Sequence, residues 1–287
     1  PVLADVEPDT LTLDPARVAE AITPRTKAIL PVHYAGHPAD MQPLLDLARA
    51  HGLYVIEDAA HALPAAYRGQ KVGTIGDFTA FSFYATKNLT TGEGGMLTGS
   101  PERIERARML ALHGMNRDAW KRYSAEGSWY YEVVAPGFKY NMTDIQAAIG
   151  LVQLERLEAM QARRRQIVAQ YQAAFSQIEA LQTPVERAGV DHAWHLYVLR
   201  LNLDRLKIDR ARFIEELKAR NIGTSVHFIP IHLHPYYVEK YGWPPEAFPV
   251  AYREYQRVLS LPLNATLTDE DVQDVINAVV DVVEHAS

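Results

Sequence analysis

AILPVHYAGHPADMQPLLDLARAHGLYVIEDAAH, residues 28–61, contains the pattern that decides the fold class. A short apolar run at 28–34 precedes a stretch of helical periodicity, which we expect to begin after Asp40 as the N-cap and to end at Gly52. A second apolar run at 53–57 completes a strand–helix–strand unit. Apolar strands joined by a crossover helix are typical of a mainly parallel sheet covered by helices, so the pattern predicts an α/β fold.

The rest of the chain predicts a second, smaller domain. A capping box at 143–146 starts a helical pattern that continues to about Phe175, and this helix joins an expected main domain at 1–155 to an α+β domain at 156–287. The later domain is expected to contain a half-exposed strand at 194–203, a helix at 209–221, a strand at 224–229 and a loop at 230–249.

Composition narrows the classes of function. The 287 residues are 48% hydrophobic and 22% charged, as in globular proteins, and carry a net charge of -6 with no basic run, so we expect no nucleic-acid partner. The chain has no cysteine, which excludes disulfides and thiolate chemistry and fits a reducing compartment; we expect the cytoplasm. No apolar run approaches the roughly 18 residues of a membrane span, so we expect no membrane partner.

Polar residues follow two of the expected strands. Asp58 and His61 come after the run at 53–57, and Ser82 and Lys87 come at and after the next strand. Open α/β sheets bind ligands at the carboxyl ends of their strands. An aspartate, a lysine, and a serine with nearby glycines are the set that a pyridoxal phosphate enzyme needs. Alternatively, Asp58 caps a helix and Lys87 is a solvated surface charge.

With these motifs the chain resembles the DegT/DnrJ/EryC1/StrS family of sugar aminotransferases, within the fold type I pyridoxal phosphate enzymes. The resemblance is carried by PVHYAG (31–36), EDAAH (57–61), FSF (81–83) with KN (87–88), GEGG (92–95), KYNMTD (139–144) and LSLPL (259–263). HG at 113–114 with DAW at 118–120 is most similar to the branch that aminates UDP-linked 4-keto sugars, such as the 4-amino-4-deoxy-L-arabinose transaminase.

The resemblance implies a three-layer α/β/α main domain, a smaller α+β C-terminal domain and a pyridoxal 5'-phosphate cofactor. It implies that Lys87 binds the cofactor covalently and is the catalytic residue, while Asp58 binds the pyridinium nitrogen. His61 would lie against the cofactor ring or its phenolic oxygen, and Ser82 would bind the phosphate. Asn141 would reach the phosphate in the neighbouring subunit of a homodimer with shared active sites.

The implied reaction is transamination of a nucleotide-linked keto sugar in polysaccharide biosynthesis, with L-glutamate as the amino donor. Lys87 favours this over the dehydration performed by a related branch, which has histidine at that place. Members of the family have a segment before the equivalent of Pro1 with a phosphate-binding turn and an aromatic residue. We therefore expect a chain that is incomplete at its amino terminus.

Three histidines in and just before the expected loop support rival interpretations. His227, His232 and His234 could together hold zinc, which would make the protein a metal-dependent hydrolase. Because clustered histidines more often only form hydrogen bonds, we expect no metal and predict that His227 and His232 contact the substrate. A non-catalytic protein that binds the cofactor or a nucleotide sugar is the remaining alternative.

Overall fold

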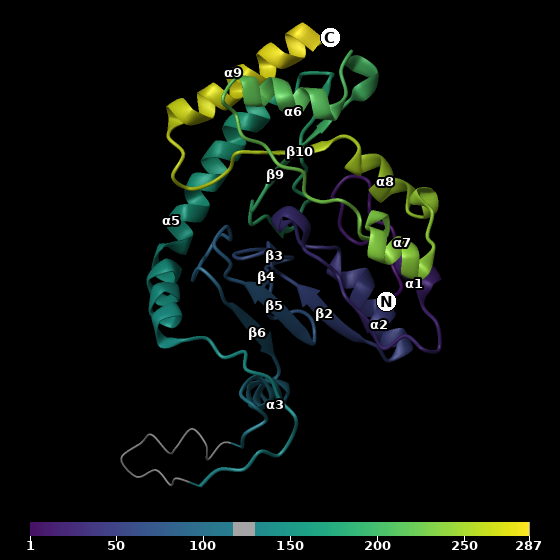
Figure 1. Ribbon diagram of the computed structural model, residues 1–287, viewed down its shortest axis with the longest axis vertical. Helices are drawn as coiled ribbons and strands as arrows, with labels where there is room; N and C mark the ends of the chain where they lie inside the picture. Colours follow the sequence, from purple (N-terminus) through teal and green to yellow (C-terminus); the bar gives the residue numbers. More distant parts are fainter. Residues whose placement is uncertain (117–129, 287) are drawn as a thin grey trace.

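The computed structural model describes residues 1–116 and 130–286, so the motif at 118–120 lies outside the described residues. The first half of the chain is built around a four-stranded sheet with the order β1-β2-β5-β6 (Figure 1). β1, β2 and β5 are parallel, and β6 pairs antiparallel with β5. The strands are β1 (Ala28–Ile29), β2 (Tyr54–Asp58), β5 (Phe78–Ser82) and β6 (Gly95–Gly99).

The strand–helix–strand unit is confirmed, because helix α2 (Met41–His51) connects β1 to β2. It buries Met41 and Leu44 in a core shared with the two strands, and it ends at Gly52, whose φ of 65° is left-handed. Asp40 precedes the helix, but its carboxylate does not cap it and instead accepts the Tyr67 hydroxyl.

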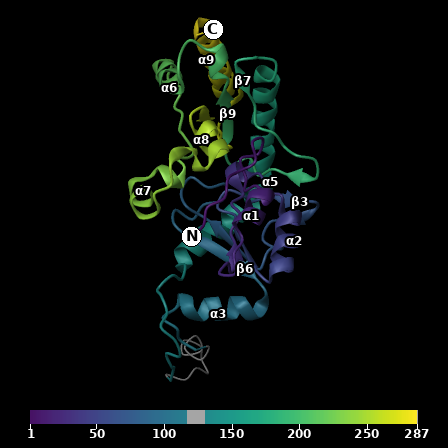
Figure 2. The same cartoon turned by 90° about the vertical axis from the view of Figure 1, so that its right-hand side faces the viewer.

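The helices α3 (Pro101–Ala111) and α9 (Asp269–Ala286) lie at opposite ends of the molecule (Figures 1 and 2). The long helix α5 (Asp144–Phe175) starts at the predicted capping box, in which the side chains of Thr143 and Gln146 each bond the backbone N–H of the other residue. Large apolar residues near its start are exposed, whereas Leu157, Ile167, Val168, Tyr171 and Phe175 further along are buried. The longer helices are α3 (Pro101–Ala111), α5 (Asp144–Phe175), α6 (Arg210–Ala219) and α9 (Asp269–Ala286), beside the shorter α1 (Pro15–Ala21).

The largest hydrophobic core lies between α5, α6, α9 and a second sheet of order β10-β9-β7. The strand expected at 194–203 is present as β9. The prediction that this strand is half-exposed was wrong, because all five residues of β9 are buried. One face enters the core, while on the other face Arg200 donates to the carbonyls of Pro8 and Asp9. The strands of the two smaller sheets are β3 (Ala66–Tyr67), β4 (Gln70–Lys71), β7 (Leu181–Gln182), β8 (Val190–Asp191), β9 (Tyr197–Leu201) and β10 (Val258–Leu261).

Two expectations for residues 224–249 were wrong. The strand at 224–229 is reduced to a single bridge between Ser225 and Ser260. The expected loop contains helix α7 (Pro235–Tyr241), with α8 (Pro249–Tyr255) directly after it. Proline at the first position of each helix suits the helical φ and has no N–H to leave unpaired there.

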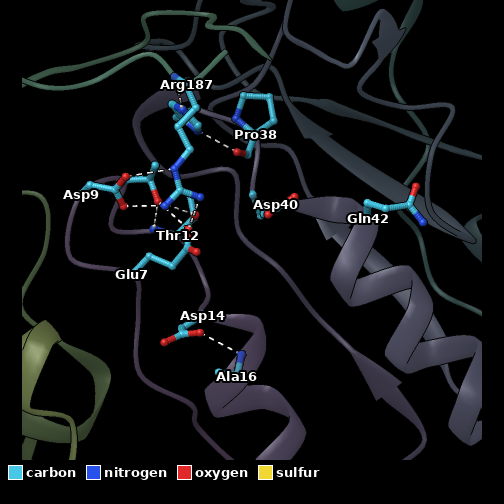
Figure 3. A network of polar contacts seen from close by, with 12 residues as sticks. Glu7, Asp9, Thr12, Asp14, Ala16, Pro38, Asp40, Gln42 and Arg187 are labelled. Atoms are coloured by element: carbon cyan, nitrogen blue, oxygen red, sulfur yellow. Dashed lines mark hydrogen bonds and ion pairs between the residues drawn. The ribbon is translucent and has the colours of Figure 1, made fainter. Parts of the chain in front are cut away.

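Charged groups attach the amino-terminal residues to later parts of the chain. The guanidinium of Arg187 pairs with Glu7 at 2.6 Å and, through two nitrogens at 3.0 and 2.6 Å, with Asp9 (Figure 3). The carboxylate of Asp5 accepts the N–H groups of Val250 and Ala251 at the start of α8. These contacts fix residues 5–9 against the second half of the chain. Within the described part of the chain, no helix is long and apolar enough to cross a membrane.

Candidate active site

The candidate site begins at one edge of the four-stranded sheet, where β2 ends at Asp58 and β5 ends at Ser82. Since these strands are parallel and Asp58 is in register with Ala80, the two polar residues emerge at the same edge. Asp58 is half-buried, and its Oδ1 accepts the N–H of Ala60 at 3.0 Å. The carboxylate therefore keeps acceptor capacity for a cationic or N–H group.

Lys87 lies in the turn after β5, where its N–H donates to the carbonyl of Tyr84 at 2.9 Å. Burial lowers the pKa of the half-buried Lys87 amine, and the nearby charge of Asp58 only partly opposes this effect. The acid and the amine, although 29 positions apart in the sequence numbering, thus sense each other electrostatically. A lysine of lowered pKa has a larger share of the neutral, nucleophilic amine.

His61 is buried beside this pair, with its ring centroid 4.3 Å from that of His195 and 5.9 Å from that of Phe228. Burial, followed by the charges of Lys87 and His227, lowers the pKa of His61 to about 3, so the ring is neutral at pH 7. Its Nδ1 is buried and has no hydrogen-bond partner among the described residues. An unpaired buried polar atom is costly, so a ligand group that pairs with Nδ1 would fit this site.

Ser82 brings a half-buried hydroxyl to the sheet edge, where it accepts the N–H of Tyr84 at 3.3 Å. Its partner across the ladder is Gly95. A Cβ at Gly95 would lie 2.6 Å from the carbonyl oxygen of Phe81, so only glycine allows this close approach of the two strands.

Asn141 makes its side-chain hydrogen bonds within its own segment. It is exposed just before α5, and its side chain bonds locally to Lys139 and to the carbonyl of Met142. No contact between Asn141 and either Asp58 or Lys87 occurs in the described parts of the chain. Its predicted role toward a second subunit stays a prediction.

The three histidines of the zinc interpretation have separate surroundings. Nδ1 of His227 lies 2.8 Å from the Ser260 hydroxyl, while Nε2 of the buried His232 lies 2.9 Å from the carbonyl oxygen of Pro245. His234 is exposed before α7. Residues 1–116 and 130–286 contain no group of three potential metal ligands, so the zinc site has no structural support.

The two histidines predicted to bind substrate differ in their access to the site. His227 is half-buried, the Tyr34 hydroxyl donates to its carbonyl, and its pKa is lowered by burial and by Lys87. It is therefore close enough to Lys87 to sense its charge. The ring of His232 bonds the carbonyl oxygen of Pro245 and packs against the ring of Phe248, with the two ring centroids 4.8 Å apart. Its contact with substrate stays a prediction.

Sequence reasoning missed His195. This buried residue contacts His61 and also Asn88, the residue after Lys87. The only available signal was that a histidine stands before the start of a strand, and such a pattern has no specificity by itself.

The fold that presents these residues is that of an aminotransferase of fold type I. Residues 1–280 match the DegT/DnrJ/EryC1/StrS aminotransferase family, and the chain belongs to that family.

Two curated relatives match nearly the whole chain. It is 58% identical over 280 residues to an uncharacterised protein of Methanocaldococcus jannaschii, covering 97% of this chain and 72% of that protein. It is 54% identical over 288 residues to the spore coat polysaccharide biosynthesis protein SpsC of Bacillus subtilis, covering 100% of this chain and 74% of SpsC.

Among solved structures, the chain is similar to Spr1654 of Streptococcus pneumoniae, which is described as a sugar aminotransferase. The PMP form superimposes with a TM-score of 0.89 at 34% identity, covering 99% of this chain and 76% of Spr1654. A PLP form of the same protein is also known. The family is pyridoxal phosphate-dependent, and the protein is an aminotransferase of sugar metabolism.

Proposed function

We propose that the protein transfers an amino group from L-glutamate to a nucleotide-linked keto sugar, with a UDP-linked 4-keto sugar as the best candidate. The observation that carries the assignment is the position of the half-buried Lys87 after β5, within electrostatic reach of Asp58 at the carboxyl edge of the sheet. The relationship to SpsC, named for spore coat polysaccharide biosynthesis, supports a sugar substrate. The sequence motif at 113–114 with 118–120 supports the 4-keto branch.

The residues fit the cofactor, because the unpaired Nδ1 of His61 and the acceptor capacity of Asp58 require a polar partner. Bound pyridoxal phosphate would supply an aldehyde that captures amines and a ring that stabilises negative charge on the adjacent carbon. Lys87 would hold it covalently through Nζ, Asp58 would hold the proton on its ring nitrogen, and Ser82 would bind its phosphate.

Lys87 has a second task once the donor amine replaces it. Its freed amine would be the base that takes the proton from the α carbon of glutamate and the acid that delivers it to the carbon of the bound cofactor. Its lowered pKa suits both directions, because the neutral form must be available near pH 7. In the second half of the reaction the same groups work in reverse on the sugar.

We further propose a homodimer in which Asn141 contributes to the site of the partner subunit. The start of α5, next to Asn141, exposes a group of apolar side chains that a second subunit would cover. The exposed residues are Ile145, Ile149, Leu151, Val152 and Leu154. We also retain the division into domains at 1–155 and 156–287, which is supported by a largest core whose residues all lie at or after Ile167.

The assignment is tested by the visible absorbance of the protein with added pyridoxal phosphate, before and after borohydride, followed by peptide mapping. We expect one cofactor per chain on the peptide that contains Lys87 and none in Lys87→Ala. The exposed Lys71→Ala is the matched control and should retain full labelling. Covalent cofactor in Lys87→Ala would overturn the assignment, and cofactor on Lys87 without amino transfer would indicate a binding protein. Zinc bound to the purified protein in a one-to-one ratio would favour the alternative function, a metal-dependent hydrolase.

A further inference from the structure

Residues 192–195 form a buried segment that has no regular secondary structure, directly before β9. Four N–H groups of this segment are paired, two of them with the carbonyls of Ala35 and Gly36. Its carbonyls are paired with side chains from elsewhere, including Gln161 and Arg164 of α5. Backbone saturated in this way is held in one conformation, since each lost bond would leave a buried polar group unpaired.

The remaining carbonyl of the segment is bound by Asn88, the residue that follows Lys87. Nδ2 of Asn88 donates to the carbonyl of Ala193 at 2.8 Å, and Oδ1 lies 3.0 Å from Nδ1 of His195. Because the amide oxygen can only accept, Nδ1 of His195 must carry the proton. Asn88 thus fixes the backbone of the segment and the tautomer of its histidine at the same time.

His195 in turn lies against His61. The two ring centroids are 4.3 Å apart with the planes inclined by 39°, and both residues are more than nine-tenths buried. Burial, with the charges of His61 and Lys87, lowers the pKa of His195 to about 2. The ring is therefore neutral at pH 7 and has one ring proton, which the hydrogen bond to Asn88 places on Nδ1.

We propose that Asn88 is a positioning residue for the reaction, which fastens the turn that carries Lys87 to segment 192–195 and holds His195 against His61. Without the amide, the turn loses its side-chain attachment to the buried segment, and the Lys87 amine becomes more exposed to water. The groups around that amine are Asp58 at the end of β2, His61 after it, His195 before β9, and His227 before α7.

The first test measures the tautomer of His195 in the wild-type protein without cofactor, by ¹⁵N NMR of the histidine ring nitrogens. The geometry requires a protonated Nδ1 and a bare Nε2, and this pattern should be lost in Asn88→Ala. A proton on Nε2 in the wild-type protein would overturn the proposal, and this measurement does not depend on how well any variant folds.

The second test measures the pH dependence of acetic anhydride labelling at Lys87, read by mass spectrometry in the cofactor-free protein. Because a more exposed amine regains its ordinary pKa, Asn88→Ala should move the labelling midpoint of Lys87 upward by roughly half a pH unit or more. Asn202→Ala removes another asparagine that donates to a backbone carbonyl, that of Glu179, and should leave the midpoint unchanged. An unchanged midpoint in folded Asn88→Ala would overturn the proposal.

If Asn88→Ala does not fold, Asn88→Ser is measured in the same way and judged by the same shift. The proposal rests on Lys87 being the cofactor lysine, which the borohydride mapping tests separately. The labelling needs no cofactor, so a wrong assignment of Lys87 and a wrong role for Asn88 give different results.

Discussion

Nε2 of His33 lies 2.9 Å from Oε2 of Glu57, and both side chains are fully buried directly behind the strand end that carries Asp58. Nδ1 of His33 accepts the N–H of Ala39, so Nε2 carries the proton and donates to the carboxylate. The other carboxylate oxygen accepts from Thr79 and from the N–H of Gly76. The strand that presents Asp58 is therefore held by a buried acid whose two oxygens are both hydrogen-bonded.

Glu57→Gln is expected to destabilise the protein by about 1–3 kcal/mol, because the amide would place a donor against the Nε2–H of His33. Burial alone would raise the pKa of Glu57, but the hydrogen bonds from His33, Thr79 and Gly76 outweigh it and lower that pKa below 4.5. The ionised form thus stabilises the fold above about pH 4.5, and this contribution is lost as pH falls further. Urea denaturation at pH 7 and pH 4 measures both effects.

The exposed Glu20→Gln is the control for that series and should change the free energy of unfolding by less than about 0.5 kcal/mol. Equal stability of Glu57→Gln and wild type at pH 7 would contradict the role of the buried pair.

Stability should also decrease as the pH falls below about 6.5, because His61 and His195 are neutral in the folded protein. Their pKa values are lowered to about 3 and about 2, mainly by burial, whereas the unfolded chain takes up protons near pH 6.5. Each histidine then costs up to about 1.4 kcal/mol of stability per pH unit. His195→Gln should reduce this slope between pH 6.5 and 5, while the exposed His285→Gln should not. An unaltered slope in His195→Gln would mean that its ring is protonated in the folded state.

Asp58→Asn should fold normally and lose roughly two orders of magnitude or more in the rate of amino transfer. Asparagine keeps an oxygen that can accept the N–H of Ala60, but it has no charge to hold a proton on the cofactor ring. Steady-state rates with saturating cofactor measure the effect, with exposed Asp46→Asn as the control. Near-normal turnover would make Asp58 a local turn residue.

His227→Ala should weaken the half-reaction with the keto sugar more than the half-reaction with glutamate. Ser260→Ala should produce a smaller change in the same direction, since the Ser260 hydroxyl lies 2.8 Å from Nδ1 of His227 and orients the ring. Single-turnover measurement of each half-reaction separates the two substrates, and exposed His234→Ala serves as the control. Equal losses in both half-reactions would contradict the prediction that His227 contacts the keto sugar.

Mixed dimers test the shared site. Inactive Lys87→Ala chains and inactive Asn141→Ala chains should regain activity after subunit exchange, because one site of each mixed dimer then contains both intact residues. Exchange is verified by mass spectrometry of differently tagged chains. If exchange is verified and no activity returns, the shared site is contradicted. Asn141 then has only a local role, through its bonds to Lys139 and Met142.

The sequence determined the elements whose signals are local. The unit at 28–61 was predictable because helical spacing, a glycine stop and two apolar runs lie within one short stretch, and the capping box of Thr143 and Gln146 needs only four residues. The family resemblance also came from short motifs, and it predicts that Lys87 and Asp58 belong to one site.

Only the tertiary structure decided which distant residues meet. His195 bonds Asn88 across 107 positions, and β9 is buried on both faces because the amino-terminal residues cover the side opposite the core. Local periodicity reports one buried face of a strand, but it contains no information about a second segment that packs on the other face. The tautomer of His195, the neutral state of His61 and the lowered pKa of Lys87 are likewise properties of packing, since desolvation exists only after the distant parts of the chain have come together.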